Sequence, residues 1–441
     1  ALFAASAIAM TAVPTVCSAE ETTEAAQTEF KDIDIDTSKE VEVVMYVLGD
    51  RPAGQDIVDE NINRILKEKL NCTLKINWIG WAEYTNKYPL LFSSGEAFDM
   101  IYVSDTWLNF SSYTRKGAFM SLNDLWEKYA PNNYAEQSES AIEEATLDGN
   151  IYAIPSLRAT YNAYGPLYRT DILKDADWDG VIETFDDVEK YGDLVKEYAP
   201  EMEVLDIYSK GSNWDDMWMG QQGYINIDPY GLLWYDPTEE NPKLFTYYEE
   251  DTIMDFLETM TRWNEKGFFS KSALADTDST KFVNGKAAMT IDNPDTYSTD
   301  YAEHPDWNIG YANMRKSIKH LPYMQDGMAI SSTSKNPERA LAIWDLLVTD
   351  REFYDAFNYG ILDTTYTLND AGQFKITDPD LYAQTGMFSA KVMEYYRNVD
   401  GAPENLDSLY DEWEKQIAAD NSAERFSGFV LDYTPVETEY A

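Results

Sequence analysis

The segment "VEVVMYVLG", residues 41–49, decides the fold of this chain. Its β-branched residues predict a buried strand, and residues 55–70 then repeat apolar side chains at helical spacing. Two further strands are predicted at "TLKINWI" (73–79) and "FDMIYVS" (98–104), separated by the helical stretch "AEYTNKYPLLFSSGE" (82–96). Alternating strands and helices are typical of an α/β fold with a doubly wound sheet.

Large aromatic residues follow the predicted strands at the points where they end. Trp81 comes just after the second strand, and Asp105 and Trp107 come just after the third. In a doubly wound sheet, ligands bind outside the carboxyl ends of the strands. We therefore expect these three residues to line a ligand site, whereas Trp78, inside the second strand, is expected to pack in the core.

A second α/β region is predicted after the turn and short strand "DGNIYAIP" (148–155). Its segments "GSNWDDMWMGQQGY" (211–224) and "YGLLWYDP" (230–237) place Trp214, Trp218 and Trp234 among amides and carboxylates. Aromatic rings can stack on the C–H faces of sugars while amides and carboxylates take their hydroxyls. This composition favours a carbohydrate-binding face. Helices are predicted at 252–266 and from Asn336-Pro337 onward.

The first nineteen residues, "ALFAASAIAMTAVPTVCSA", have the apolar run and small-residue site of a secretory signal. Cleavage after Ala19 would remove Cys17, whereas cleavage before Cys17 would make it a lipid anchor; we favour simple secretion. Residues 20–39 are acidic and lack periodicity, which predicts a flexible tether. We expect both ends of the natural chain to be clipped here, and we expect no membrane span in the mature protein.

The composition excludes several classes of function. With 34 Lys+Arg against 79 Asp+Glu, the formal net charge is -45, which would repel nucleic acid and anionic membranes. The chain has two histidines, neither spaced for zinc nor beside a cysteine, and no nucleophile elbow, phosphate loop or dinucleotide motif. Paired carboxylates for glycoside hydrolysis remain open, because no two of the many acids are marked out.

One segment has the spacing of a calcium loop. In "DADWDGVIETFD", Asp175, Asp177, Asp179 and Asp186 stand at loop positions 1, 3, 5 and 12. The competing interpretation is a turn followed by a helix that Thr184 caps, with acidic residues in its first turn. We favour the helix start, and keep calcium as the alternative.

Several segments together resemble the family 1 extracellular solute-binding proteins of ABC importers, in particular a lipoprotein branch associated with oligosaccharide uptake. They are "DGNIYAIP" followed by "LYRTDIL", "NEKGFFSKSAL", "FVNGKAAMTIDNPDTY" (282–297) and "DGMAISSTSKNPERALAIWDLLVTDREFYDAFNYGI" (326–361). The resemblance covers residues 41–440.

This resemblance implies two α/β lobes that close on a ligand by a hinge motion. It places lobe 1 at 40–160 plus 295–332 and lobe 2 at 161–294 plus 333–441, with crossing segments at 157–165, 289–295 and 331–335. Ligand contacts are expected from Tyr164 in the first crossing, from Asp292 and Asn293 in "TIDNP", and from Asp326. Asp292 and Asn293 are equally expected to bond the hinge backbone.

The resemblance implies an extracellular, monomeric carbohydrate binder that delivers an oligosaccharide to the membrane subunits of an ABC permease, without catalysis and without a required cofactor. A binder of cationic or peptide solutes on the same fold is the first alternative, and a secreted glycoside hydrolase is the second. The sequence names neither the sugar nor its length or linkage.

Overall fold

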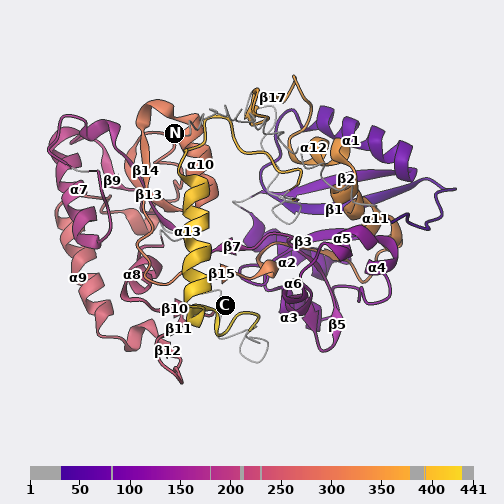
Figure 1. Ribbon diagram of the computed structural model, residues 1–441, viewed down its shortest axis with the longest axis horizontal. Coiled ribbons are helices and arrows are strands. Elements are labelled where there is room, and N and C mark those ends of the chain that lie inside the picture. Colours follow the sequence, from indigo (N-terminus) through magenta and orange to yellow (C-terminus); the bar gives the residue numbers. More distant parts are fainter. Residues whose placement is uncertain are drawn as a thin grey trace, which may run out of the picture. The chain divides into compact units, whose positions relative to one another are not determined.

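The computed structural model describes residues 31–80, 83–178, 180–208, 213–228, 231–377, 392 and 394–429. Contacts divide the chain into residues 1–32 and 33–441. Of the first unit only Lys31 and Asp32 are described, and neither lies in a helix or strand. The second unit holds every element named below (Figure 1).

The first sheet has five strands in the order β2-β1-β3-β16-β6. They are β1 (Val41–Leu48), β2 (Cys72–Ile79), β3 (Met100–Val103), β6 (Ile154–Pro155) and β16 (Gly327–Ile330). Strands β1, β2 and β3 are parallel, as the strand-helix-strand pattern predicts, whereas β16 is antiparallel to both β3 and β6. The sheet is therefore mixed, because β16 enters it from the opposite direction.

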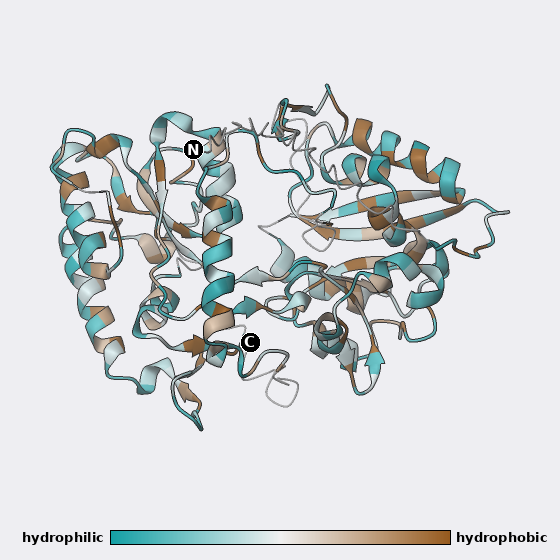
Figure 2. Cartoon of the chain, in the orientation of Figure 1, coloured by the Kyte–Doolittle hydropathy of each residue, from teal (hydrophilic) through white to brown (hydrophobic). Residues whose placement is uncertain are grey.

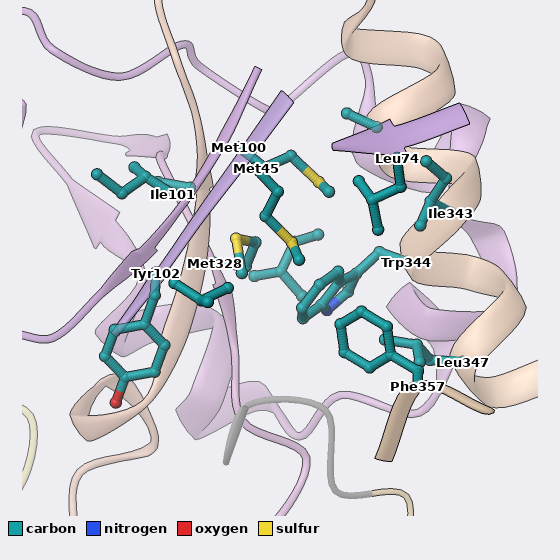
Figure 3. Packing of buried hydrophobic residues seen from close by; sticks show 14 of the residues in the cluster. Met45, Leu74, Met100, Ile101, Tyr102, Met328, Ile343, Trp344, Leu347 and Phe357 are labelled. Carbon is teal, nitrogen blue, oxygen red and sulfur yellow. The ribbon is translucent and has the colours of Figure 1, made fainter. Parts of the chain in front are cut away.

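Helices from two distant parts of the chain bury this sheet. They are α1 (Gln55–Leu70), α4 (Trp126–Tyr129), α5 (Pro131–Ala135), α11 (Pro337–Thr349) and α12 (Arg351–Asn358). Figure 3 shows Ile343, Trp344 and Leu347 of α11 facing Met45 and Leu74 of the strands. Each such side chain contributes roughly 1.5–3 kcal/mol when it leaves water. This core therefore joins the beginning of the chain to residues beyond 337.

The second sheet has four strands in the order β14-β8-β13-β9. They are β8 (Gly165–Arg169), β9 (Glu203–Leu205), β13 (Ala287–Asp292) and β14 (Ile309–Tyr311). Strand β13 is parallel to β9 and antiparallel to β8, so this sheet is mixed as well. Its core includes Val188 and Tyr191 of α7 (Phe185–Tyr198) and Trp263 of α9 (Thr252–Glu265).

The remaining elements lie outside the two large sheets and their main covering helices. The helices are α2 (Tyr84–Ser94), α3 (Phe110–Arg115), α6 (Glu139–Glu144), α8 (Trp214–Gln222), α10 (Pro294–Glu303) and α13 (Leu406–Ala419). The strands are β4 (Thr146–Leu147), β5 (Asn150–Ile151), β7 (Thr160–Tyr161), β10 (Ile225–Asn226), β11 (Leu233–Tyr235), β12 (Phe245–Thr246), β15 (His320–Leu321), β17 (Tyr366–Leu368) and β18 (Phe374–Ile376). The 3-10 turns are η1 (Asp171–Leu173), η2 (Tyr247–Glu249), η3 (Ala273–Ala275), η4 (Pro305–Trp307), η5 (Tyr323–Gln325) and η7 (Ser422–Glu424).

Two segments, which we call the crossing ribbon, connect the sheets. Residues 156–164 lead from β6 to β8, and residues 312–326 lead from β14 to β16. They pair with each other where β7 meets β15. Helix α13 packs on this ribbon, because its Trp413 lies in one small cluster with Ala163 and Ile318.

The ribbon includes residues 157–164 of the predicted crossing at 157–165, whereas the other two predicted crossings coincide with segments placed elsewhere. Residues 289–292 belong to β13, which is paired within the second sheet, and residues 331–335 lead from β16 to α11. The second crossing is 312–326 instead. A stretch that hydrogen-bonds within one sheet cannot also connect that sheet to another.

Three segments do not lie where the predicted boundaries of the tether and the two lobes place them. Strand β14 pairs with β8 of the second sheet, and α11 packs against α1, α4 and α5 on the first. Within the expected tether, Ile33 and Ile35 pack on the first core, and buried Arg339 donates to the carbonyl of Asp36. The division into two lobes stays a prediction, with these segments placed by their pairing and packing.

Buried Asp345 joins α11 to the start of α5. Its Oδ1 accepts hydrogen bonds from the N–H groups of Asn132 and Asn133 at 2.8 Å each, and its Oδ2 accepts from the Asn132 amide at 2.7 Å. We expect Asp345→Ala to lower the free energy of unfolding by about 3 kcal/mol in urea titrations, because these donors lose their acceptor. The exposed control Glu258→Ala should change it by less than about 0.5 kcal/mol. Equal losses in both variants would contradict this role.

Candidate functional site

The carboxyl edge of the first sheet collects residues from three separate strands. Gly327 of β16 lies opposite both Val103 of β3 and Pro155 of β6. Strand β16 runs antiparallel to β3 and β6. The residues that precede β16 therefore lie beside the residues that follow β3 and β6. Trp107, Arg158 and Asp326 are thereby brought to one edge, which is where ligands bind in sheets of this kind.

The second sheet presents a matching edge. Asp292, the last residue of β13, lies opposite Gly165, the first residue of β8. Asn293 follows the one strand and Tyr164 precedes the other, so both residues stand at this edge. The segment that contains Asp292 and Asn293, which was expected to be a crossing, therefore ends a strand at the edge of the second sheet.

Between these edges lies a cavity of about 200 Å³. Its walls come from both sheet edges, from the crossing ribbon and from α13. The lining residues are Trp107, Arg158, Thr160, Tyr161, Tyr164, Asn293, Pro294, Asp295, Leu321, Gln325, Asp326 and Tyr410. Aromatic rings therefore alternate with carboxylate, amide and guanidinium groups around one space.

Asp326 is held in place from below by the first sheet. The hydroxyl of Tyr102, a buried residue of β3, donates to its Oδ1. Burial, together with the neighbouring carboxylate, keeps the pKa of Tyr102 well above its usual value. Tyr102 therefore remains a hydrogen-bond donor, and the Asp326 carboxylate keeps a fixed place in the cavity wall.

Arg158 and Tyr410 lie together in the cavity wall. The Arg158 guanidinium lies 5.1 Å from the centre of the Tyr410 ring, and one of its nitrogens is 4.0 Å from Asp295 Oδ1. The Tyr410 hydroxyl donates to the same oxygen at 3.4 Å. Burial alone would lower the pKa of Arg158, but Asp295 and the nearby tyrosines raise it overall. The guanidinium is therefore a permanent cation that orients both neighbours.

Asp292 and Asn293 build the start of α10. Asp292 Oδ1 accepts from the Asn293 N–H at 2.7 Å and from the Thr296 hydroxyl at 2.9 Å, and Asn293 Oδ1 caps the helix by accepting from the Thr296 N–H at 2.9 Å. Burial raises the pKa of Asp292. Asp292 therefore has the backbone-bonding role, whereas Asn293 both caps the helix and lines the cavity.

The arrangement suits reversible binding of a polar ligand with apolar faces. The rings can stack on such faces, and the carboxylates, amides and guanidinium can exchange hydrogen bonds with hydroxyl groups. Among the residues with described placement, no group of three or more His, Cys, Asp or Glu residues is arranged to hold a metal ion.

Residues 51–352 match the model of a protein family described as "Bacterial extracellular solute-binding protein". The chain belongs to this family. This solute-binding protein is 26% identical over 330 residues to a "Carbohydrate ABC transporter substrate-binding protein" of Streptococcus pneumoniae, and 27% identical over 236 residues to "Lipoprotein LipO" of Bacillus subtilis. The matches cover 72% and 50% of the chain and 64% and 44% of those relatives, so it spans less than two thirds of their length.

Solved structures share the fold. The N-glycan transport solute-binding protein NgtS of Streptococcus pneumoniae, in complex with Man1GlcNAc, has a TM-score of 0.68 at 20% identity, covering 91% of this chain and 88% of that one. The S. pneumoniae ABC-transporter substrate-binding protein FusA, in complex with kestose, has a TM-score of 0.59 at 16% identity, covering 89% and 87%. These likenesses confirm the expected two-sheet α/β architecture with flanking helices.

The cavity of this solute-binding protein contains four of the predicted contact residues, Trp107, Tyr164, Asn293 and Asp326. Asp105 lies beside it and instead bonds Ser111, accepting from its N–H at 3.2 Å and from its hydroxyl. Trp81 lies outside the described residues. Whether any of these residues touches a ligand stays a prediction.

The tryptophans predicted on the second half lie elsewhere. Trp214 and Trp234 are only 2% and 1% exposed, so neither ring presents a face on which a sugar could stack. Trp218 is partly buried, and its indole N–H donates to the Thr252 hydroxyl at 2.9 Å. The polar residues beside these tryptophans predicted an exposed face. In the structure, Trp214 and Trp218 of α8 pack in the second core, and Trp234 is buried in β11.

Trp78, expected in the core, packs against the first core while remaining partly exposed. It also lines a groove together with Tyr46, Lys87 and Leu90. Its strand β2 lies at the edge of the sheet and contacts α2.

Several cavity residues were not predicted from the sequence. Arg158 comes shortly after β6, a strand that was predicted from the sequence. The expectation that ligand residues follow the ends of strands could therefore have included it. Tyr161 and Leu321 belong to the crossing ribbon, and Tyr410 lies on a helix with an ordinary amphipathic pattern. No local signal marks Tyr410, because its role depends on where α13 packs.

At the proposed calcium loop the structure shows the competing helix start. Thr184 caps α7, and its hydroxyl accepts from the Asp187 N–H at 3.2 Å while the Asp187 carboxylate reaches back to the Thr184 N–H at 3.0 Å. Asp179 lies outside the described residues, and Asp175, Asp177 and Asp186 are exposed. Calcium at this loop stays a prediction without added support.

Asp300 of α10 gives the protein a distinct pH dependence. The side chain is 5% exposed, and its Oδ2 has no hydrogen-bond partner among the described residues. Burial, with repulsion from Asp292 and Glu303, raises its pKa to about 7. The folded state therefore binds this proton more tightly than the unfolded chain, and stability is lost as the pH rises from about 4 to about 7.

We expect Asp300→Asn to reduce this loss of stability by an amount on the order of a few kcal/mol. Urea unfolding at pH 4.5 and pH 7.5 measures it, with exposed Asp306→Asn as the matched control. Parallel pH profiles for the parent chain and Asp300→Asn would show that Asp300 titrates normally.

Proposed function

We propose that this solute-binding protein is the substrate-binding component of a carbohydrate ABC importer and captures an oligosaccharide in the cavity between the two sheet edges. The observation that carries the proposal is the lining itself, in which Trp107, Tyr161, Tyr164 and Tyr410 alternate with hydrogen-bonding groups. Family membership, the carbohydrate transporter relative and the sugar-bound neighbours support it.

Each wall would recognise a different part of a sugar. The rings would stack on the C–H faces, which adds about 0.5–1.5 kcal/mol to the burial of each contact. Asp326 and Asp295 would accept hydrogen bonds from hydroxyls, and Arg158 and Gln325 would donate them. Because Asp326 and Arg158 are already held by protein partners, little side-chain freedom is lost on binding.

A ligand in this cavity would contact both sheet edges and the ribbon that connects them. Ligand binding would therefore favour the arrangement in which both edges touch the sugar, and an ABC permease would receive that form. The sugar would be released unchanged, because a binding component needs no catalytic step. Extracellular location follows from the family, and no helix within the described ranges is long and apolar enough to span a bilayer.

A cationic or peptide ligand is the second candidate. It is favoured by Asp295 and Asp326 in the cavity and by the net charge of -45. Arg158 in the same wall argues against it, because a cation there would meet like charge. Salt distinguishes the two, since it weakens binding of a charged ligand far more than binding of a neutral sugar.

The first test is a thermal-shift screen with N-glycan, fructo-, malto- and alginate oligosaccharides, alongside spermidine and a peptide mixture. A ligand at one hundred times its dissociation constant adds about 2.7 kcal/mol to the stability of the folded state. A shift with one sugar family, with the sugar recovered intact, supports the proposal. A shift with spermidine or peptides alone overturns it in favour of the second candidate.

Trp107→Ala tests the site itself. We expect it to weaken binding of the sugar that shifts the parent protein by tenfold or more, about 1.4 kcal/mol, because a stacking ring is lost. Isothermal titration calorimetry measures the affinity. The control is Trp307→Ala, which removes a ring stacked on His304 with centroids 3.8 Å apart and outside the cavity lining. Equal affinity in both variants would exclude Trp107 as a contact.

A further inference from the structure

Helix α13 forms a wall of the cavity but is anchored by few apolar side chains. It contributes Tyr410 to the lining, yet only Trp413 and Ile417 are buried along its length. Figure 2 shows the helix, yellow in Figure 1, as mostly hydrophilic. Helices in proteins depend on packing rather than on intrinsic propensity. Polar contacts must therefore contribute to holding α13 on the crossing ribbon.

His320 of β15 makes such contacts with both of its ring nitrogens. Nε2 lies 3.0 Å from Glu414 Oε1 on α13, and Nδ1 contacts Glu424 Oε1 in η7, just beyond the helix. The same Glu424 oxygen accepts the backbone N–H of His320 at 3.1 Å. A neutral imidazole has one N–H, whereas the imidazolium has two. With carboxylate acceptors at both nitrogens, this geometry fits the protonated ring.

The contacts of His320 continue to the cavity wall. The hydroxyl of Tyr161, which lines the cavity, donates to the same oxygen of Glu414. Tyr410 precedes Glu414 by one helical turn and therefore lies on the same side of α13. Glu414, which His320 contacts, thus bonds Tyr161 directly and belongs to the helix that carries Tyr410.

We propose that protonated His320 clamps α13 onto the crossing ribbon, so positioning Tyr161 and Tyr410 for ligand binding, and that the clamp loosens when the ring loses its proton. His320 is a positioning residue in this scheme. The inference depends on the proposed function only in taking this cavity as the ligand site.

The charged surroundings of His320 set the direction of the pH effect. Glu414 faces it from α13, Glu424 from η7 and Tyr161 from β7. A neighbouring polar cavity adds Glu144 of α6 and Arg425, and Lys319 precedes it in the chain. Burial alone would lower the pKa of His320, but the hydrogen bonds to Glu414 and Glu424 raise it overall. Burial lowers the pKa of Lys319 to about 8, so its titration needs a separate control.

The raised pKa of His320 determines in which pH range the clamp is stable. A histidine whose pKa is raised by folding stabilises the clamp fully below its ordinary pKa of about 6.5, and this stabilisation is lost as the pH rises through the folded value. The bond from Tyr161 and the contact with His320 lower the pKa of Glu414, so that carboxylate is charged throughout the pH range in which His320 titrates. The clamp therefore weakens as the pH rises above about 6.5.

Hydrogen exchange of the intact chain tests the clamp without any sugar. Protection factors of residues 406–419 are compared at pH 6 and pH 9 after correction for intrinsic exchange, with α7 as the internal reference. We expect protection of α13 to fall by about tenfold or more, because charge-assisted hydrogen bonds are lost, while α7 keeps its protection. The chain has two histidines, so NMR titration resolves both rings, and the midpoint of His320 should coincide with the loss of protection.

Two variants separate His320 from other titrating groups. In His320→Gln, protection of α13 should be low at both pH values, whereas His304→Gln, which removes the ring stacked on Trp307, should behave like the parent and assigns the NMR signals. Constant protection of α13 while His320 titrates overturns the proposal. So does a pH-dependent loss that persists in His320→Gln, which would assign it to Lys319 or another group. Because neither readout uses a sugar, an unsuccessful sugar screen would count against the proposed function and leave this result unaffected.

Discussion

The site depends on the direction in which one strand enters the first sheet. Because β16 runs antiparallel to β3 and β6, its first residue lies opposite the last residue of each. Asp326 is thereby placed beside Trp107 and Arg158, although the three are far apart in the sequence. A parallel β16 would put Asp326 at the opposite edge of the sheet, and the cavity would lose its best-anchored carboxylate.

The same constraint explains the crossing ribbon. A chain that leaves the first sheet after β6 and returns to it before β16 must pass twice between the sheets, and the two passages pair at β7 and β15. The ribbon therefore forms the back of the cavity as well as the connection between the sheets. It also provides the surface on which α13 packs, so the crossing ribbon and α13 both contribute residues to the cavity wall.

Charge is distributed so that the few cations have structural roles inside an acidic protein. Lys281 is 4% exposed and bonds Glu203 and Asp276 at 3.1 Å each, and Arg339 donates to backbone carbonyls at the end of α1. Arg158 has a comparable role in the cavity wall, where it contacts Asp295 and Tyr410. Removing a buried cation from such a site would leave its carboxylates uncompensated, which costs more than the pair contributes.

By itself the sequence determined the α/β class, the first three strands with α1 and α2 between them, and the rule that ligand residues follow strand ends. Those features depend on periodicity and on neighbours in the chain, which is why Trp107 was expected at a sheet edge, whereas Asn293 and Asp326 were expected from the family resemblance. The tertiary structure alone decided that Trp214 and Trp234 are buried, that α11 covers the first sheet, that Tyr410 lines the cavity, and that His320 contacts Glu414 of α13. A ring among polar neighbours looks the same in sequence whether its helix turns it inward or outward. Only packing between segments that are distant in the sequence settles which side is buried.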